Sequence, residues 1–183
     1  YIKPYIKETI HPGLLVKNKQ GDEYLVLTPA CDISQDKCDC LILVKLIIFF
    51  NHTDLVTMKD KIKTKENELS DISDENKRIS LNETIIKDKE KFKNLIRNYI
   101  SNNKGDRYYF LPEFIDFNSK LIDFQDIQAV DIKEIGSYEK IMTISTPFMK
   151  DIQAKFSSYY ARQGSPDFDF TYMANKYSNE FLK

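Results

Sequence analysis

The chain has 183 residues, of which 42% are hydrophobic, and its 27 Lys and Arg residues nearly balance 28 Asp and Glu residues. This composition excludes bulk disorder, and the near-neutral charge gives no general electrostatic reason to expect a nucleic-acid partner. The longest apolar run, Leu41 to Phe50 with Lys45 inside it, is shorter than the about 20 residues that a membrane helix needs, so no membrane partner is expected.

The chain begins with the pattern of an extended lead-in followed by a β-hairpin. Two prolines disfavour helix within residues 1–12. Strands are predicted over residues 14–17 and 23–28, because a short Gly-containing turn joins two apolar segments there. Pro29 ends the second strand, and residues 30–34 are expected to form a compact loop or one helical turn.

The stretch from Cys38 to Phe50 is rich in Leu, Ile and Val and alternates poorly between apolar and polar residues. This pattern is typical of a strand that is buried on both faces, so a central strand is predicted there. The composition changes abruptly after this stretch, at about Asn51.

Residues 51–104 differ from the rest of the chain because Lys, Asp and Glu are interleaved along them. Apolar residues recur there at helical spacing in two sets, which predicts two amphipathic helices. The two sets are Leu55, Met58, Ile62, Leu69 and Ile72, and then Ile85, Phe92, Leu95, Ile96, Tyr99 and Ile100. Asn82 with Glu83 is the predicted start of the second helix, and Gly105 is its predicted left-handed cap.

The β pattern returns after this insertion and then gives way to helix. Strands are predicted over residues 107–112, 121–127 and about 140–144. A helix is expected to begin at residues 145–147, where hydroxyl side chains precede a proline, and a short helix is expected over about residues 172–181. The predicted apolar face of the first of these helices is Phe148, Ile152, Phe156 and Tyr159.

Together these elements predict an α+β fold with a small SH3-like or barrel-like antiparallel β core. Residues 1–50 and 105–183 would form this core and its C-terminal helix. Residues 51–104 would form a charged helical hairpin inserted between two strands of the core.

Several strings in the chain are similar to those of a group of bacterial proteins. That group has a strand–"TPxCD"–strand core, an "RYYxLP" strand and a C-terminal helix running into "RxGxPD". The matching strings here are Thr28 to Asp32, Arg107 to Pro112 and Arg162 to Asp167. The resemblance implies the same architecture and, because some members accompany receiver-like or defence-type genes, a bacterial signalling or antiviral-defence setting with a receiver-like or effector subunit as partner.

A more distant likeness is to the small barrels of toxin-type endoribonucleases, which cut RNA with basic and hydroxyl groups near their first strands. Here the first arginine is Arg78, inside the insertion, and only lysines occupy the early strands. This departure argues against ribonuclease activity, which stays as an alternative.

Cys31 and Asp32 are the candidates for a catalytic site, because they follow a strand on a turn where functional residues occur. A reactive thiolate needs a lowered pKa and usually a base. The only histidines are His11 and His52, and Asp32 would raise the pKa of a neighbouring thiol. A cysteine-dependent hydrolase is therefore an alternative, and Asp32 is expected to hold the turn through backbone hydrogen bonds.

Cys31, Cys38, Cys40 and His52 are the only residues that suggest a zinc site. Structural zinc usually takes its four ligands from closely spaced pairs on turns, and no second pair exists here. We therefore expect no metal and no cofactor, and three inert thiols. An odd number of cysteines, without a signal peptide at the start, favours a reducing compartment, and the expected location is the cytoplasm.

Arg107 and Arg162 stand out because the chain has only four arginines among its 27 basic residues. The planar guanidinium is preferred where a carboxylate or phosphate must be met by two donors. A structural pair of either arginine with an aspartate is favoured over ligand binding. Thr28 and Asp167, which lie in the same strings, are further candidates for a ligand-binding or structural role.

Paired carboxylates offer another site, since Asp123 with Asp126, or Asp167 with Asp169, could act as acid and base. None of them lies in a recognisable motif. A turn or helix cap is the favoured role of Asp167.

The apolar side of the insertion is the predicted partner-binding surface, with Phe92 and Tyr99 as its residues. The interleaved charges there are typical of a solvated helix face. The predicted function is a non-catalytic protein-interaction or regulatory module, since the core lacks a His-based or Arg-based site.

Overall fold

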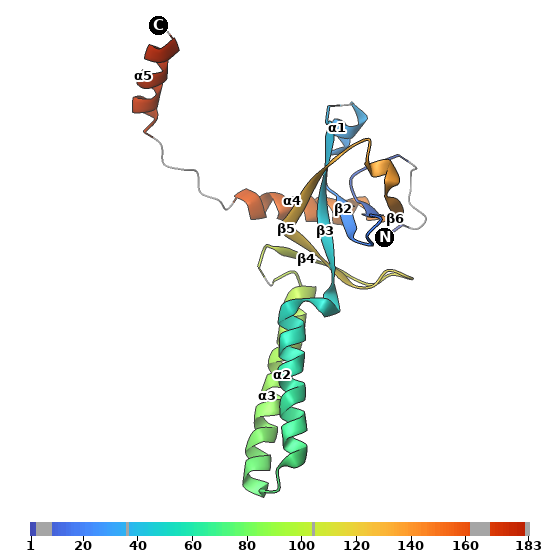
Figure 1. Cartoon of the computed structure of the whole chain (residues 1–183), viewed down its shortest axis with the longest axis vertical. Coiled ribbons are helices and arrows are strands. Elements are labelled where there is room, and N and C mark those ends of the chain that lie inside the picture. The colour runs from blue at the N-terminus through green and yellow to red at the C-terminus, as the bar shows by residue number, and fades with distance from the viewer. Residues whose placement is uncertain (3–8, 36, 104, 162–168, 182–183) are drawn as a thin grey trace.

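The computed structural model describes residues 1–2, 9–35, 37–103, 105–161 and 169–181. Its core is one six-stranded antiparallel sheet that curls into a half-barrel (Figure 1). The strands are β1 (Leu14–Lys17), β2 (Glu23–Val26), β3 (Cys40–Ile48), β4 (Tyr108–Leu111), β5 (Lys120–Asp131) and β6 (Glu139–Thr143). They lie in the order β4-β5-β3-β2-β1-β6, and the predicted α+β class with a barrel-like core is confirmed.

The two longest strands, β3 and β5, lie next to each other and carry much of the core. Neighbouring residues of β3 point to opposite faces of the sheet. Leu43 is buried in one hydrophobic cluster and Val44 in the other, and neither has any solvent exposure. The predicted central strand with two buried faces is therefore correct, although its regular part begins at Cys40 and ends at Ile48.

Helix α4 (Thr146–Ala161) covers one face of the sheet (Figure 1). It contacts that face through Met149 and Ile152, which are buried, and through Phe156 and Tyr159, which are partly buried. The prediction that Phe148 belongs to this face is wrong, because Phe148 is 60% exposed. The spacing of the observed face is three, four and three residues, so Met149 occupies the first inward position.

The first two residues lie between the two edges of the sheet. Ile2 exchanges two backbone hydrogen bonds with Thr143 of β6. The Tyr1 hydroxyl donates to the carbonyl oxygen of Pro112, just beyond β4, at 2.7 Å, and its ring stacks on Phe114. This dipeptide thus connects the two edge strands that the half-barrel leaves apart.

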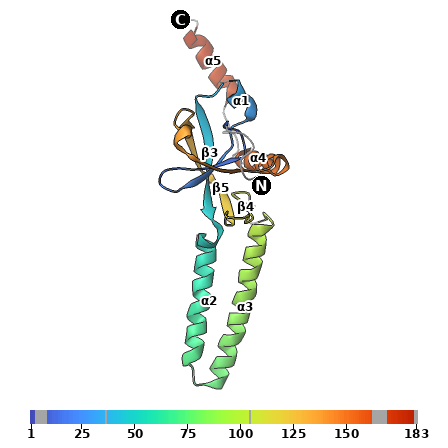
Figure 2. The same cartoon turned by 90° about the vertical axis from the view of Figure 1, so that its right-hand side faces the viewer.

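Helices α2 (Thr53–Asp71) and α3 (Glu75–Ile100) form the predicted hairpin and project from one end of the sheet (Figures 1 and 2). Helix α3 begins seven residues earlier than predicted, because Asp74 caps it by accepting a hydrogen bond from the Lys77 amide at 3.1 Å. At its C-terminal end Asn102, with φ 57°, is the first left-handed residue after the helix. Gly105, the predicted cap, is also left-handed with φ 80°, but it lies beyond the end of α3 at Ile100.

The two helices meet along a single seam. Residues with reduced exposure occur alternately three and four positions apart on each helix, as in an antiparallel two-stranded coiled coil. The residues at this spacing are 55, 58, 62, 65 and 69 with the C-cap residue 72, and 81, 85, 88, 92, 95 and 99, and Thr84 and Ile96 flank them with reduced exposure. Lys65 and Asp88 are the charged members of this seam, and their Nζ and Oδ2 atoms lie 2.8 Å apart.

The remaining elements are short. Helix α1 (Ala30–Ser34) is the predicted single turn after β2, and the 3-10 turns η1 (Phe49–Asn51) and η2 (Ile135–Ser137) follow β3 and β5. Helix α5 (Phe170–Phe181) matches the short terminal helix expected from the sequence. None of the helices within the described ranges is long and apolar enough to cross a lipid bilayer.

Candidate interaction surface

The hairpin is fixed to the sheet by a polar and aromatic cluster at its base. Tyr99 is 2% exposed, and its hydroxyl donates to Oδ2 of Asp54 at 2.9 Å and lies 3.2 Å from Nδ1 of His52. The His52 ring packs edge-on against Tyr108 of β4. Burial, and then the Asp54 carboxylate, raise the pKa of Tyr99 well above its ordinary value, so the phenol stays protonated and keeps donating.

Arg107, one of the predicted ligand-binding or structural residues, forms an ion pair beside this cluster. Its Nε and NH2 atoms donate to the two carboxylate oxygens of Asp123 at 2.7 and 2.6 Å. Asp123 is 3% exposed and also accepts from the Gln125 amide. These bonds raise the pKa of Arg107 and occupy Asp123, whereas Asp126, its predicted carboxylate partner, is exposed.

The predicted partner-binding residues, Phe92 and Tyr99, lie on the inner side of the hairpin. Tyr99 is buried in the cluster at the base, and Phe92 packs against the same hydrophobic cluster. A partner that contacted Tyr99 would therefore have to separate α3 from the sheet. The role of Phe92 and Tyr99 in binding stays a prediction. The apolar residues of the hairpin that a partner can reach freely are different ones.

Three of those accessible residues form a line along the outer side of α3. Ile79, Ile86 and Ile100 are 52%, 59% and 49% exposed. They are separated by seven and fourteen residues, and Lys93 occupies the intervening heptad position. Because a helix repeats its direction closely every seven residues, the four side chains lie on one side. We call Ile79, Ile86, Lys93 and Ile100 the outer stripe.

The charges beside the outer stripe are divided between its two halves. Glu83 lies in the first half, Glu90 lies at the midpoint and Arg97 lies in the second half, while Lys93 belongs to the stripe itself. All four are exposed, and none of them forms an ion pair with another residue in the described part of the chain. Their charges are thus available to another molecule.

An apolar groove of about 510 Å³ continues the outer stripe where α3 meets the sheet. We call it the base groove. It is lined by Tyr1, Ile100, Asn102, Tyr109, Phe110, Leu111, Pro112, Glu113, Phe114, Ile144 and Phe148. The exposed Phe148, which the sequence pattern had placed in the core, is part of this surface.

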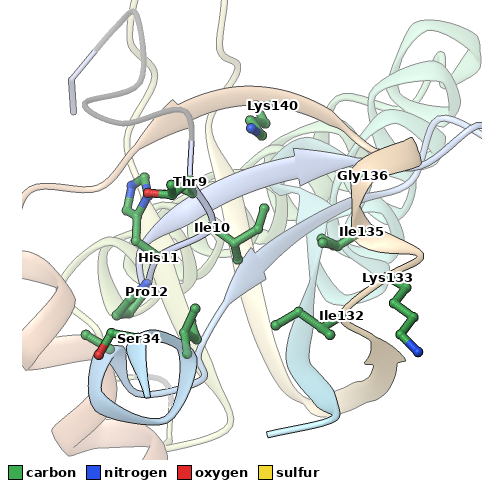
Figure 3. Close-up of a pocket in the computed structure, with 12 residues that line it drawn as sticks. Thr9, Ile10, His11, Pro12, Ser34, Ile132, Lys133, Ile135, Gly136 and Lys140 are labelled. Carbon is green, nitrogen blue, oxygen red and sulfur yellow. The ribbon is translucent and has the colours of Figure 1, made fainter. Parts of the chain in front are cut away.

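A second cleft, of about 650 Å³, lies at the opposite end of the sheet (Figure 3). Residues 9–12, helix α1, the segment between β5 and β6, and Lys140 line it. Nδ1 of His11 lies 2.7 Å from the carbonyl oxygen of Thr9, which can only accept, so Nδ1 carries the proton. Nε2 then accepts from the Thr143 hydroxyl at 3.0 Å. Both ring nitrogens of His11 are therefore occupied by structural hydrogen bonds.

Cys31 and Asp32, the sequence candidates for catalysis, are in contact on α1, whereas the candidates for metal binding do not come together. Cys31 is exposed, and its thiol contacts Oδ1 of Asp32 at 3.4 Å. Cys40 begins β3 and His52 follows its other end, so a nine-residue strand separates two of the four residues that were considered as zinc ligands. No group of three or more His, Cys, Asp or Glu residues within the described ranges could hold a metal ion.

The remaining predicted site residues have structural contacts or lie outside the description. Thr28 is buried, and its hydroxyl oxygen accepts from the Ile42 amide at 2.7 Å, which ties the end of β2 to β3. Asp169 accepts from the Tyr172 amide at the start of α5. Arg162 and Asp167 lie outside the described residues.

Comparisons with protein-family models, with curated proteins and with solved structures found no match to this chain. The site therefore has to be argued from its own residues. The sequence prediction missed the outer stripe because it assigned Ile100 to the inner set and left Ile79 and Ile86 unassigned. The seven-residue spacing of these isoleucines was the signal that could have identified it.

Proposed function

We propose that this chain is a non-catalytic protein-interaction module that binds a partner through the outer stripe and the base groove. The observation that carries this proposal is the row of half-exposed isoleucines on a helix that projects from the sheet. Isoleucines at heptad spacing form a surface that another helix can cover. Until it is covered, this surface exposes apolar area to water, which is unfavourable. The base groove extends the same surface with aromatic side chains.

The arrangement of the other candidates supports a binding role over the catalytic alternatives. A cysteine hydrolase needs a base beside its thiol, but His11 is engaged by Thr9 and Thr143 and His52 lies at the base of the hairpin. A toxin-like endoribonuclease needs accessible basic groups near its first strands, but Arg107 is held by Asp123. The bacterial signalling or antiviral-defence setting rests on the sequence resemblance alone.

Co-purification tests the proposal directly. A tagged chain expressed together with an untagged copy of itself and its native neighbouring genes is expected to retain a partner, and Ile79→Lys/Ile86→Lys is expected to lose it. Thr57→Lys/Thr64→Lys is the matched control, because it adds the same charge at the same spacing on exposed positions of α2. Equal recovery of the partner by all three proteins, with unchanged helical circular dichroism, would refute the proposal.

Thiol chemistry tests the hydrolase alternative. The parent chain and Cys31→Ser are expected to hydrolyse ester and amide test substrates at the same background rate. Hydrolysis by the parent chain that Cys31→Ser abolishes would favour the cysteine-dependent enzyme instead.

A further inference from the structure

We infer that the partner of the outer stripe is a second copy of this chain, bound in the antiparallel direction with a two-fold axis near Glu90. This inference rests on the proposed function and specifies its partner. It follows from the order of apolar and charged residues along α3 and from the position of the base groove.

The apolar residues of the stripe match their own reversed order. When two α3 helices run in opposite directions about an axis near Glu90, Ile79 of one copy lies opposite Ile100 of the other. In the same alignment Ile86 lies opposite Lys93, whose aliphatic stem can cover an isoleucine while its ammonium group stays in water. In this one alignment, every isoleucine of the stripe is therefore covered by a side chain of the second copy.

The charges favour the same direction. In the antiparallel alignment Glu83 lies within one residue of Arg97 of the second copy. Glu90 lies at the axis and would face Glu90 of the second copy in either direction, so it does not distinguish the two alignments. In a parallel alignment Glu83 would face Glu83 and Arg97 would face Arg97, which is repulsive. Exposed ion pairs add little affinity, so these charges would set the direction of pairing rather than its strength.

The base groove adds apolar surface to that of the stripe. A stable interface buries about 800 Å² on each partner. The stripe extends over 22 residues, or about 33 Å of helix at 1.5 Å per residue. At that length the tip of each hairpin would reach the other copy's base groove, where Phe148 is 60% exposed. The dimer would be elongated, with one half-barrel at each end.

Sedimentation equilibrium tests the second copy. The wild-type chain is expected at twice its mass of 21.5 kDa, and Ile86→Lys is expected at the single mass. Thr57→Lys, on the exposed side of α2, should remain dimeric. A wild-type chain that stays monomeric at the highest attainable concentration would overturn the inference. If such a monomer still lost its co-purified partner through Ile79→Lys/Ile86→Lys, the proposed function would stand while the second copy would be rejected.

Charge reversal tests the pairing of Glu83 with Arg97. Glu83→Arg and Arg97→Glu each place like charges opposite one another at two symmetric positions, and each is expected to weaken dimerisation about tenfold. The double variant restores opposite charges and should recover most of the affinity. If the double variant dimerised no more tightly than the single variants, the antiparallel alignment would be overturned.

Disulfide formation tests the direction independently. In a background with Cys31, Cys38 and Cys40 changed to Ser, Glu90→Cys lies near the axis and is expected to form an intermolecular disulfide. The cysteine of Ile79→Cys lies far from the same cysteine of the second copy in the antiparallel dimer, so this variant should not form the disulfide. Efficient cross-linking at both positions would indicate a parallel dimer and contradict the inference, and cross-linking at neither position would contradict it as well.

Discussion

The half-barrel and the helical hairpin are stabilised by different kinds of contact. The sheet is covered on both faces by buried apolar residues, which come from strands and a helix far apart in the sequence. The hairpin has one seam, made by two helices adjacent in the sequence, and that seam contains the Lys65–Asp88 pair. Where the two regions meet, Tyr99 forms polar contacts with Asp54 and His52.

This difference indicates how each region should respond to change. The sheet should lose stability through cavities, because its close-packed interior relaxes only partly around a deleted side chain. The hairpin should respond to changes in its charges, because ionic contacts at a partly solvated seam depend on pH and salt. Substitutions in each region test this contrast.

Phe124→Ala should have the largest effect, because Phe124 has no solvent exposure and packs against Phe156 and Tyr159. Deleting a buried phenylalanine side chain typically lowers the free energy of unfolding by about 3–5 kcal/mol. Urea denaturation followed by circular dichroism measures this loss. Phe50→Ala is the control, since Phe50 is 68% exposed and should change stability little. Similar losses in both variants would contradict the assignment of Phe124 to the core.

Asp123→Asn should rank second, because it removes a charged acceptor from Arg107 within the sheet. Hydrogen bonds to charged groups typically contribute about 1.5–3 kcal/mol. The lower part of that range is expected, since the Arg107 side chain is 42% exposed and water can replace part of the contact. Asp126→Asn, an exposed position on the same strand, should leave the urea midpoint unchanged. An equal shift in the two variants would show that general charge, and not the pair, is responsible.

Acid should weaken the hairpin before it unfolds the sheet. The Lys65 ammonium, and then Lys61, hold the pKa of Asp88 below its ordinary value of 3.8. A carboxyl whose pKa is lower in the folded state contributes stability above about pH 4, and this contribution is lost as the pH falls through the lowered pKa. Helical circular dichroism should therefore fall below pH 4 while the near-ultraviolet tyrosine signal of the sheet persists.

Asp88→Asn should already show the weakened hairpin at neutral pH and a flatter acid transition. Glu68→Gln is the control, because Glu68 is exposed on α2. An acid transition that is the same in wild type and Asp88→Asn would exclude Asp88 as its source.

Tyr99→Phe should have the smallest effect, since the ring stays buried and only the hydroxyl contacts with Asp54 and His52 are lost. A net loss of about 1 kcal/mol is expected, typical of one intramolecular hydrogen bond. Because the pKa of Tyr99 is raised from 10.0, the wild type should keep this contribution at neutral pH and lose it only above about pH 10. Tyr172→Phe, at a position 64% exposed, provides the comparison. An unchanged melting temperature in Tyr99→Phe would show that the hydroxyl does not hold the hairpin.

The strands and the existence of the hairpin could be predicted because local patterns determine them. Three local signals predicted these elements correctly. They are the turn near Gly21, the apolar run after Cys38 and the change in composition at Asn51. The start of α3 was misplaced because Asn82 and Glu83 form a plausible cap, whereas the true cap, Asp74, lies close behind the end of α2. Cap signals inside a charged sequence are frequent, and tertiary contacts decide which one is used.

Which side of each helix faces inward could not be settled from the sequence alone. Phe148 and Met149 are equally compatible with an apolar face, and only the position of the sheet makes Met149 the buried one. Ile100 was assigned to the inner set of α3 because it follows Tyr99, yet a step of one residue turns a side chain by about 100°. The sequence could predict that Arg107 pairs with an aspartate. It could not predict that this aspartate is Asp123, because the contact depends on how neighbouring strands are placed.

The length of the hairpin makes it a lever. Helix α3 has 26 residues, which correspond to about 39 Å at 1.5 Å per residue. A tilt of about 10° at its base would therefore displace its tip by about 7 Å, by the same helix geometry. Conversely, a force applied at the tip acts on Tyr99 with a long arm and is passed to His52 and Tyr108 at the edge of the sheet. Whatever binds along α3 is thus mechanically coupled to β4, the edge strand beside the base groove.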